Sequence, residues 1–141
     1  VVIPRVNSLA SGRFHSEVEK IIAGSFVEGK GGVFGVSVGK VSCGDDVVQI
    51  CNFLSEMESK YNIQPGSLCI IPWVETAKGL INAHDICISS DRIVAAAFGG
   101  DDFCNDMEIE KTPGCLDYPR QLVSIVAKAA GSVALDTPYP E

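Results

Sequence analysis

Charged side chains follow the short apolar runs of this sequence, at the point where each run ends. They are Arg5, Lys40, Glu75, the adjacent pair Asp101 and Asp102, and Asp136. Carboxylates that meet at neighbouring strand ends, without matching cations close by, typically share a divalent metal ion, and oxygen ligands with room for water favour Mg²⁺. We therefore take Glu75 and Asp102 as candidate ligands of a Mg²⁺ ion.

Each of these residues also has a purely structural interpretation. Glu75 could cap a helix that begins near Ala77, and Asp101 or Asp102 could cap a short turn, because acidic residues favour helix N-termini. Arg5 could grip a carboxylate with two parallel hydrogen bonds, or it could form a structural ion pair. Residue type alone leaves both interpretations open.

Alternating strands and helices must position these side chains. Runs rich in Val, Ile and Ala predict five strands, at Val1–Val6, Val33–Lys40, Leu68–Val74, Arg92–Phe98 and Ser132–Asp136. Segments of helical periodicity lie between them, at Phe14–Ala23, Asp45–Tyr61, Ala77–Ser89 and Tyr118–Ala130. This alternation indicates an α/β protein built from β-α units that feed a parallel sheet.

Two architectures fit five parallel strands. One is a complete open sheet, doubly wound with helices on both faces; the other is a portion of a (β/α)₈ TIM barrel, which needs eight strands and ~200 or more residues. Ligands bind at the C-terminal ends of the strands in both architectures. Periodicity alone does not choose between them.

Bulk composition limits the class of protein. The 141 residues are 46% hydrophobic and 21% charged, with a mean hydropathy of +0.22, which is typical of a single compact domain over residues 1–141. A net charge of −7 and a pI near 4.7 argue against nucleic acid as the main partner. No apolar run approaches the ~20 residues of a membrane-spanning helix. We expect a soluble protein, at which a small anion could still bind locally.

Cysteine usage predicts the compartment. Six cysteines occur without a C-x-x-C pair, and several fall inside apolar runs, so we interpret them as buried thiols in a reducing compartment. No signal peptide is visible, but Val1 already looks like the middle of a strand, so a targeting segment could precede it. The expected location is the cytoplasm or the mitochondrial matrix.

Other residues with recognition chemistry have structural interpretations. His15 and His84 fall in expected helices, away from strand ends, and are assigned to packing or surface roles. Trp73 is interpreted as a core or mouth residue rather than a stacking platform. Residues 28–32 (EGKGG) lack the spacing of a phosphate loop and precede a strand, so we expect a plain turn. No serine matches the G-x-S-x-G nucleophile elbow.

Six short motifs occur in a distinctive order across nearly the whole chain. They are Pro4-Arg5-Val6-Asn7-Ser8, Gly39-Lys40-Val41-Ser42, Trp73-Val74-Glu75-Thr76-Ala77-Lys78-Gly79-Leu80, Phe98-Gly99-Gly100-Asp101-Asp102-Phe103, Asp117-Tyr118-Pro119-Arg120-Gln121 and Ala134-Leu135-Asp136-Thr137. Together they resemble the citrate lyase beta-subunit-like branch of the HpcH/HpaI aldolase family. Two positions depart from the family pattern: Gly39 replaces a usual proline, and Pro119 replaces a usual small residue.

The resemblance implies a fold and a site. Family members are (β/α)₈ barrels of about twice this length, so the chain would supply roughly the third to seventh strands. Glu75 and Asp102 would hold Mg²⁺, and Arg5 would be the catalytic residue that binds a carboxylate of a 2-oxo acid. Backbone amides would accept the second carboxylate or carbonyl of the substrate; they are those of Gly99, Gly100 and Asp101.

The resemblance also implies an activity. The family cleaves or forms a 3-hydroxyacyl-CoA, such as citryl-, malyl- or citramalyl-CoA, from an acyl-CoA and a 2-oxo acid. Alternatives are a class II aldolase acting on free 2-oxo acids and a non-catalytic barrel fragment that binds an organic acid. A homo-oligomer, trimer or larger, is expected of the full-length parent. The acidic cluster of the second strand and the closing eighth strand are absent from this chain, so we do not expect activity from the chain alone.

Overall fold

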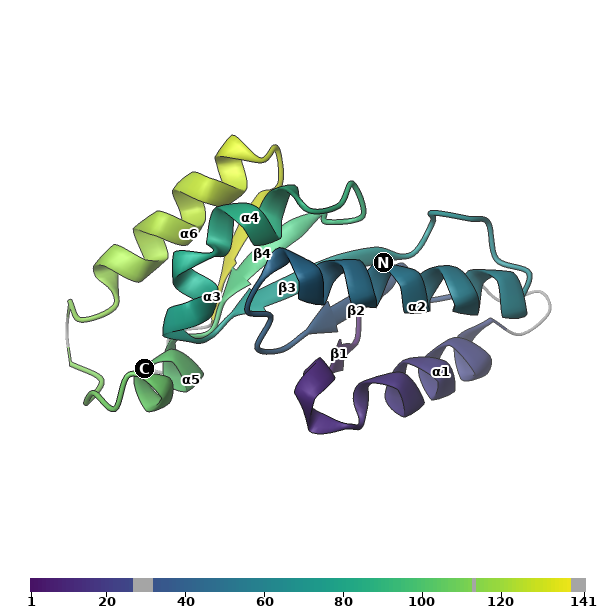
Figure 1. The fold of residues 1–141 in the computed structure, drawn as a ribbon, viewed down its shortest axis with the longest axis horizontal. Helices are drawn as coiled ribbons and strands as arrows, with labels where there is room; N and C mark the ends of the chain where they lie inside the picture. Colours follow the sequence, from purple (N-terminus) through teal and green to yellow (C-terminus); the bar gives the residue numbers. More distant parts are fainter. Residues whose placement is uncertain (27–31, 113, 138–141) are drawn as a thin grey trace.

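The computed structural model describes residues 1–26, 32–112 and 114–137. Within them, five strands form one parallel sheet in which each strand lies beside the next in chain order (Figure 1). The strands are β1 (Arg5–Val6), β2 (Gly35–Val38), β3 (Cys69–Val74), β4 (Ala95–Phe98) and β5 (Val133–Asp136). Each one lies inside its expected range, so the strand prediction is confirmed.

Helices connect the strands. They are α1 (Phe14–Ser25), α2 (Gly44–Lys60), α3 (Ala77–Ile81), α4 (Ala83–Ile88), α5 (Gly100–Asp106) and α6 (Asp117–Ala129), and the 3-10 helix η1 (Leu9–Ser11) precedes α1. The single helix expected over residues 77–89 is divided at Asn82, whose side-chain amide donates to the Ser42 carbonyl at 2.9 Å. The sequence did not predict α5, because this short segment carries no extended apolar stripe.

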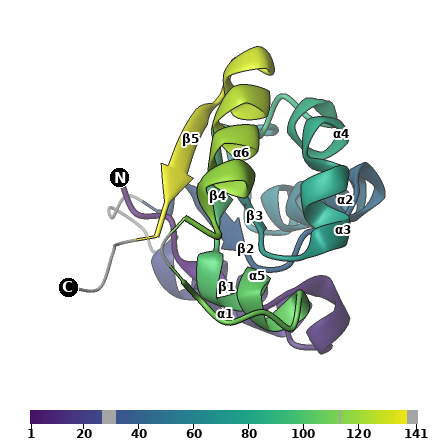
Figure 2. The ribbon, with the colours of Figure 1, turned by 90° about the vertical axis from the view of Figure 1, so that its left-hand side faces the viewer.

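Side chains alternate between the two faces of the sheet, and the helices of the described residues cover only one face. Figure 2 shows α2, α3, α4 and α6 on the same side of the sheet. Val36, Val38, Ile70, Val74 and Phe98 point to this side and are buried. The opposite face carries Arg5, Ser37, Trp73, Ala97 and Leu135; the strand register pairs Arg5 with Ser37, and Trp73 with Ala97, which in turn pairs with Leu135. Leu135 is 41% exposed there, so this face is open at the β5 edge.

This arrangement decides between the two expected architectures. A doubly wound sheet has helices on both faces and a point where the strand order reverses. Here the order runs from β1 to β5 without reversal, and within the described residues one face carries no helix (Figure 2). The open doubly wound alternative is therefore wrong, and the chain folds as consecutive β/α units of a (β/α)₈ barrel.

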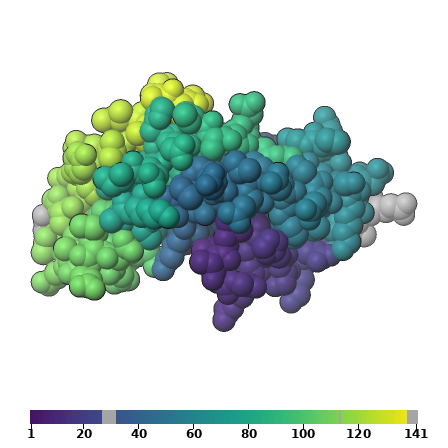
Figure 3. Space-filling model, in the orientation of Figure 1, coloured from purple at the N-terminus to yellow at the C-terminus, as the bar shows by residue number. Residues whose placement is uncertain are grey.

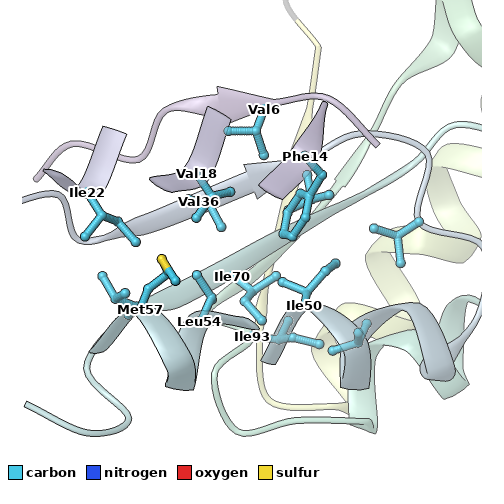
Figure 4. Close-up of a cluster of buried hydrophobic side chains, with 14 of the residues drawn as sticks. Val6, Phe14, Val18, Ile22, Val36, Ile50, Leu54, Met57, Ile70 and Ile93 are labelled. Atoms are coloured by element: carbon cyan, nitrogen blue, oxygen red, sulfur yellow. The ribbon is translucent and has the colours of Figure 1, made fainter. Parts of the chain in front are cut away.

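A large apolar cluster fixes α1 and α2 against β1, β2 and β3. Figure 4 shows Val18 and Ile22 facing Leu54 and Met57 across this cluster. On α2 the buried residues Val47, Ile50, Leu54 and Met57 follow the helical spacing expected from the sequence. This stripe faces the sheet, so these helices hold the first three strands in place.

A buried ion pair lies at the N-terminal ends of the strands, opposite the end that carries the charged residues. The Glu58 carboxylate, 2% exposed, accepts two hydrogen bonds from the Arg92 guanidinium at 2.7 and 2.8 Å. It also accepts from the amides of Gly66 and Leu68. Burial alone would raise the pKa of Glu58, but the bonds from Arg92, Leu68 and Gly66 outweigh it and lower the pKa from 4.5 to about 2. One carboxylate thus joins α2 to the segments that lead into β3 and β4.

Three composition-based expectations can be compared with the described residues. All six cysteines are free thiols; Cys87 and Cys104 are buried and the other four are partly buried, so the prediction of buried thiols holds for two. In the part of the chain that the structure describes, every helix is too short or too polar to cross a membrane. The plain turn expected at residues 28–32 lies outside the described residues, apart from Gly32.

Candidate functional site

A cleft of about 390 Å³ opens at the C-terminal ends of β1, β2 and β3. It is lined by Arg5, Val6, Asn7, Ser8, Ser11, Gly39, Lys40, Glu75 and Asp102. In Figure 3 the surface is hollowed between the purple segment that carries η1 and the green segment that carries α5. The parallel strands bring together most of the charged residues that the sequence places at strand ends.

Glu75 lies at the bottom of this cleft. It follows β3, two residues after Trp73, so both side chains point to the helix-free face of the sheet. Its side chain is only 1% exposed. One carboxylate oxygen, Oε1, accepts from Arg5 Nη2 at 2.6 Å, and the other, Oε2, accepts from the Lys40 amide at 3.0 Å. Two strands other than β3 therefore hold this carboxylate in a fixed orientation.

Small residues make room for Glu75. The inward positions at the end of β4 are Ala95, Ala97 and Gly99, and a Cβ at Gly99 would lie 2.4 Å from Glu75 Oε1. A Cβ at Gly39 would lie 3.3 Å from Glu75 Oε2. Glycine at position 99 is required because any side chain there would occupy the place of the carboxylate.

Arg5 reaches Glu75 by stacking on an aromatic ring. Its guanidinium carbon lies 4.2 Å from the centroid of the Trp73 ring, a cation–π contact. The Trp73 indole N–H in turn donates to the Ser37 hydroxyl. Trp73 is half-buried in the mouth, as expected, but it is also a stacking platform, contrary to expectation. A row of residues on three neighbouring strands thus sets the direction of the Arg5 guanidinium.

Asp102 approaches the cleft from the first turn of α5. Its carboxylate lies 3.0 Å from Lys40 Nζ and 4.0 Å from Arg5 Nη2, and its side chain is 38% exposed. The neighbouring Asp101 is 78% exposed and pairs with Lys111 at 2.7 Å instead. Of the two adjacent acids, only Asp102 faces the cleft.

Helix capping does not account for these acids. Thr76 is the N-cap of α3, and its hydroxyl accepts from the Gly79 amide at 3.0 Å, so the capping interpretation of Glu75 is wrong. Gly99 occupies the N-cap position of α5, and the side chains of Asp101 and Asp102 contact lysines. The acids lie in the first turn of α5, where the helix dipole favours negative charge.

The structure leaves some strand-end residues outside the cleft. Asp136 faces the helix side of the sheet, 2.8 Å from Arg120 of α6. The Gly99 amide donates to the Val74 carbonyl at 3.1 Å, whereas the amides of Gly100 and Asp101 belong to the first turn of α5, where N–H groups have no acceptor within the helix. The role of these amides in substrate binding stays a prediction.

The histidines play no part in the cleft. His15 lies on α1 with its ring against Phe14 and Phe53, at centroid distances of 5.2 and 4.6 Å. His84 lies exposed on α4. Both positions agree with the packing or surface roles expected from the sequence.

The donor set fits a hard divalent cation. Mg²⁺ typically takes one or two protein carboxylates and completes its octahedral shell with water and substrate oxygens. Glu75 and Asp102 supply two such carboxylates beside one cleft, and the absence of a Cβ at Gly39 and Gly99 makes room for the first of them. Among the described residues there is no cluster of three or more acidic, histidine or cysteine side chains, so a closed all-protein cage is not formed there.

Comparisons with known proteins identify a family and its relatives. The family model described as HpcH/HpaI aldolase/citrate lyase matches residues 1–141. The beta subunit of citrate lyase from Leuconostoc mesenteroides subsp. cremoris is 23% identical over 140 residues, which are 98% of this chain and 44% of that protein. Human mitochondrial citramalyl-CoA lyase is 28% identical over 146 residues, covering 96% of this chain and 41% of the relative.

A solved structure shares the fold. The citrate lyase beta subunit of M. tuberculosis, complexed with oxaloacetate and magnesium, superposes with a TM-score of 0.70 at 20% identity, over 94% of this chain and 52% of that one. The barrel assignment is therefore confirmed. The chain spans less than half the length of the curated relatives that it matches.

Proposed function

The chain belongs to the HpcH/HpaI aldolase/citrate lyase family, and from that premise we propose that it carries the metal and carboxylate-binding half of a Mg²⁺-dependent carbon–carbon lyase. The proposed reaction cleaves or forms a 3-hydroxyacyl-CoA, such as citryl-, malyl- or citramalyl-CoA, from an acyl-CoA and a 2-oxo acid. The observation that supports it most is the convergence of Arg5, Glu75 and Asp102 on one cleft.

The metal would be held by Glu75 and Asp102. When bound, Mg²⁺ would supply a Lewis acid at the 2-oxo group of the acid, where it would stabilise negative charge on that oxygen. The two carboxylates are already oriented toward the same space by Arg5 and Lys40, which limits the rearrangement that a cation would require.

Arg5 would bind the carboxylate of the 2-oxo acid. The guanidinium is 48% exposed at the cleft, so it can present hydrogen-bond donors to a ligand while its ring contact with Trp73 fixes its plane. A planar guanidinium matches a carboxylate with two parallel bonds. The amides of Gly100 and Asp101 would take a second carboxylate or carbonyl oxygen of the substrate.

Oligomerisation and location are part of the same proposal. The known relatives include a bacterial lyase subunit and a mitochondrial lyase, so we propose the cytoplasm or the mitochondrial matrix for this protein. A trimer or larger homo-oligomer is proposed for the full-length protein, with small-molecule substrates as its partners.

Product analysis separates the proposed activity from its alternatives. The full-length protein should release acetyl-CoA together with a 2-oxo acid from at least one of citryl-, malyl- and citramalyl-CoA, and only when Mg²⁺ is present. Chromatography of the products formed from the CoA thioesters and from the corresponding free acids would check this. Cleavage of free hydroxy acids alone would indicate the class II aldolase, and binding without products would indicate the organic-acid-binding fragment; either result would contradict the proposal.

A further inference from the structure

Lys40, like Arg5, contacts both candidate metal ligands. Its backbone amide donates to Glu75 Oε2 at 3.0 Å, and its ammonium lies 3.0 Å from Asp102 Oδ1. No other residue among those described contacts the two carboxylates through both its backbone and its side chain. Lys40 follows the end of β2, so this single position links ligands that come from β3 and α5.

The backbone of Lys40 is held in an unusual conformation. Its φ is +54°, in the left-handed region that side chains with a Cβ rarely adopt. A residue kept in this region needs support from its surroundings, and such residues concentrate at functional sites. Here the conformation places the amide on Glu75 and leaves the ammonium directed at Asp102.

Two cations balance the two carboxylates of the cleft, and the ammonium of Lys40 is the one that can turn away. Arg5 and Lys40 carry the positive charges, and Glu75 and Asp102 carry the negative ones. The side chain of Lys40 is 53% exposed, and the cleft that it lines is open to solvent. A dication on the two carboxylates would compete with the ammonium for Asp102, and the flexible lysine stem would let the ammonium turn into the cleft.

We propose that Lys40 is a second substrate-carboxylate residue of this site, which pairs with Asp102 until a divalent cation displaces it. This inference rests on the proposed function. Lys40 competes with the cation for Asp102 and afterwards contributes a positive charge to the bound 2-oxo acid. The backbone amide of Lys40 keeps its bond to Glu75 throughout.

The test is a pair of opposite effects in the full-length protein. Lys40→Met should tighten Mg²⁺ binding by up to about fivefold, the size of an ion pair between half-exposed groups, measured by titration calorimetry. The same change should weaken the binding of oxaloacetate at saturating Mg²⁺ by about tenfold or more, the size of a charge-assisted hydrogen bond. A purely structural lysine would move both affinities in the same direction.

Two further variants control this test. Lys40→Gly keeps the amide donor and suits a positive φ, so it should reproduce both effects without disturbing the fold. Lys60→Met removes a lysine from a comparable exposed ion pair, with Glu19, at the far end of α2, and should leave both affinities unchanged.

The outcomes distinguish the inference from the proposed function. Mg²⁺ binding that weakens in both Lys40 variants, or oxaloacetate binding that stays unchanged in them, overturns the role of Lys40 alone. A wild-type protein that binds no Mg²⁺, or whose Mg²⁺ binding survives in both Glu75→Ala and Asp102→Ala, overturns the proposed function and this inference with it.

Discussion

Replacing Glu75 by alanine should lower the kcat/KM of Mg²⁺-dependent thioester cleavage by about a thousandfold or more. A bound metal would contribute several kcal/mol to the stabilisation of negative charge on the oxygen of the 2-oxo group, and each ~1.4 kcal/mol is tenfold in rate. The side chain of Glu75 is 1% exposed and accepts from the Arg5 guanidinium and the Lys40 backbone amide, so its removal also frees Arg5 from the position in which the cleft holds it.

The loss should occur without unfolding. Arg5 is 48% exposed and remains hydrated when its partner is removed, so no isolated charge is left buried. Initial rates at saturating Mg²⁺, with circular dichroism and thermal unfolding of the same samples, would check both parts. Glu56→Ala, on the exposed side of α2, is the matched control and should keep wild-type rates. Near-wild-type activity of Glu75→Ala would refute the assignment of this residue as a metal ligand.

The second large effect is on stability. Replacing Glu58 by glutamine should lower the free energy of unfolding by about 3–5 kcal/mol at pH 7, because it leaves the Arg92 guanidinium, 13% exposed, without its carboxylate. The backbone amides of Gly66 and Leu68, which donate to the Glu58 carboxylate, would also lose a charged acceptor and keep at most the neutral amide oxygen of glutamine. Denaturant unfolding of the full-length protein would measure the loss, and Glu56→Gln should change the stability by less than about 0.5 kcal/mol.

Lowering the pH should remove the stabilisation by the Glu58–Arg92 ion pair from the wild-type protein. The folded pKa of Glu58 is about 2, below its ordinary value of 4.5. As the pH falls, the Glu58 carboxylate is protonated in the unfolded state before it is protonated in the folded state. Its contribution to the free energy of unfolding, ~3 kcal/mol, is therefore complete above pH ~4.5 and disappears as the pH falls toward 2. Between pH 5 and 3, Glu58→Gln should lose less stability than the wild type. Parallel losses in the two proteins would show that another group accounts for the acid sensitivity.

Local sequence was sufficient to predict most elements of the fold. The strands were predictable because parallel strands buried under helices read as dense apolar runs, such as Ile70–Val74. Charged residues at the ends of these runs then identified the edge of the sheet that carries the cleft. The break at Asn82 was not predictable, because it depends on a hydrogen bond to Ser42, 40 residues away in sequence.

The detailed site depended on contacts between distant segments. The stack of Arg5 on Trp73 needs the register of β1, β2 and β3, which no spacing in the sequence specifies. The choice between Asp101 and Asp102 depends on the starting residue of α5, because one position along a helix turns a side chain by ~100°. The bonds of Lys40 depend on a positive φ that lysine does not signal.

The most direct test of the account is a calorimetric titration of Mg²⁺ into the wild-type protein and its Asp101→Ala and Asp102→Ala variants, with oxaloacetate present. The two acids are adjacent on α5, but only Asp102 faces the cleft, whereas Asp101 pairs with Lys111. We predict that the wild type and Asp101→Ala bind one Mg²⁺ per chain with similar affinity, and that Asp102→Ala binds it at least about tenfold more weakly. Equal affinities in the two variants would contradict the proposal that Glu75 and Asp102 form the metal site.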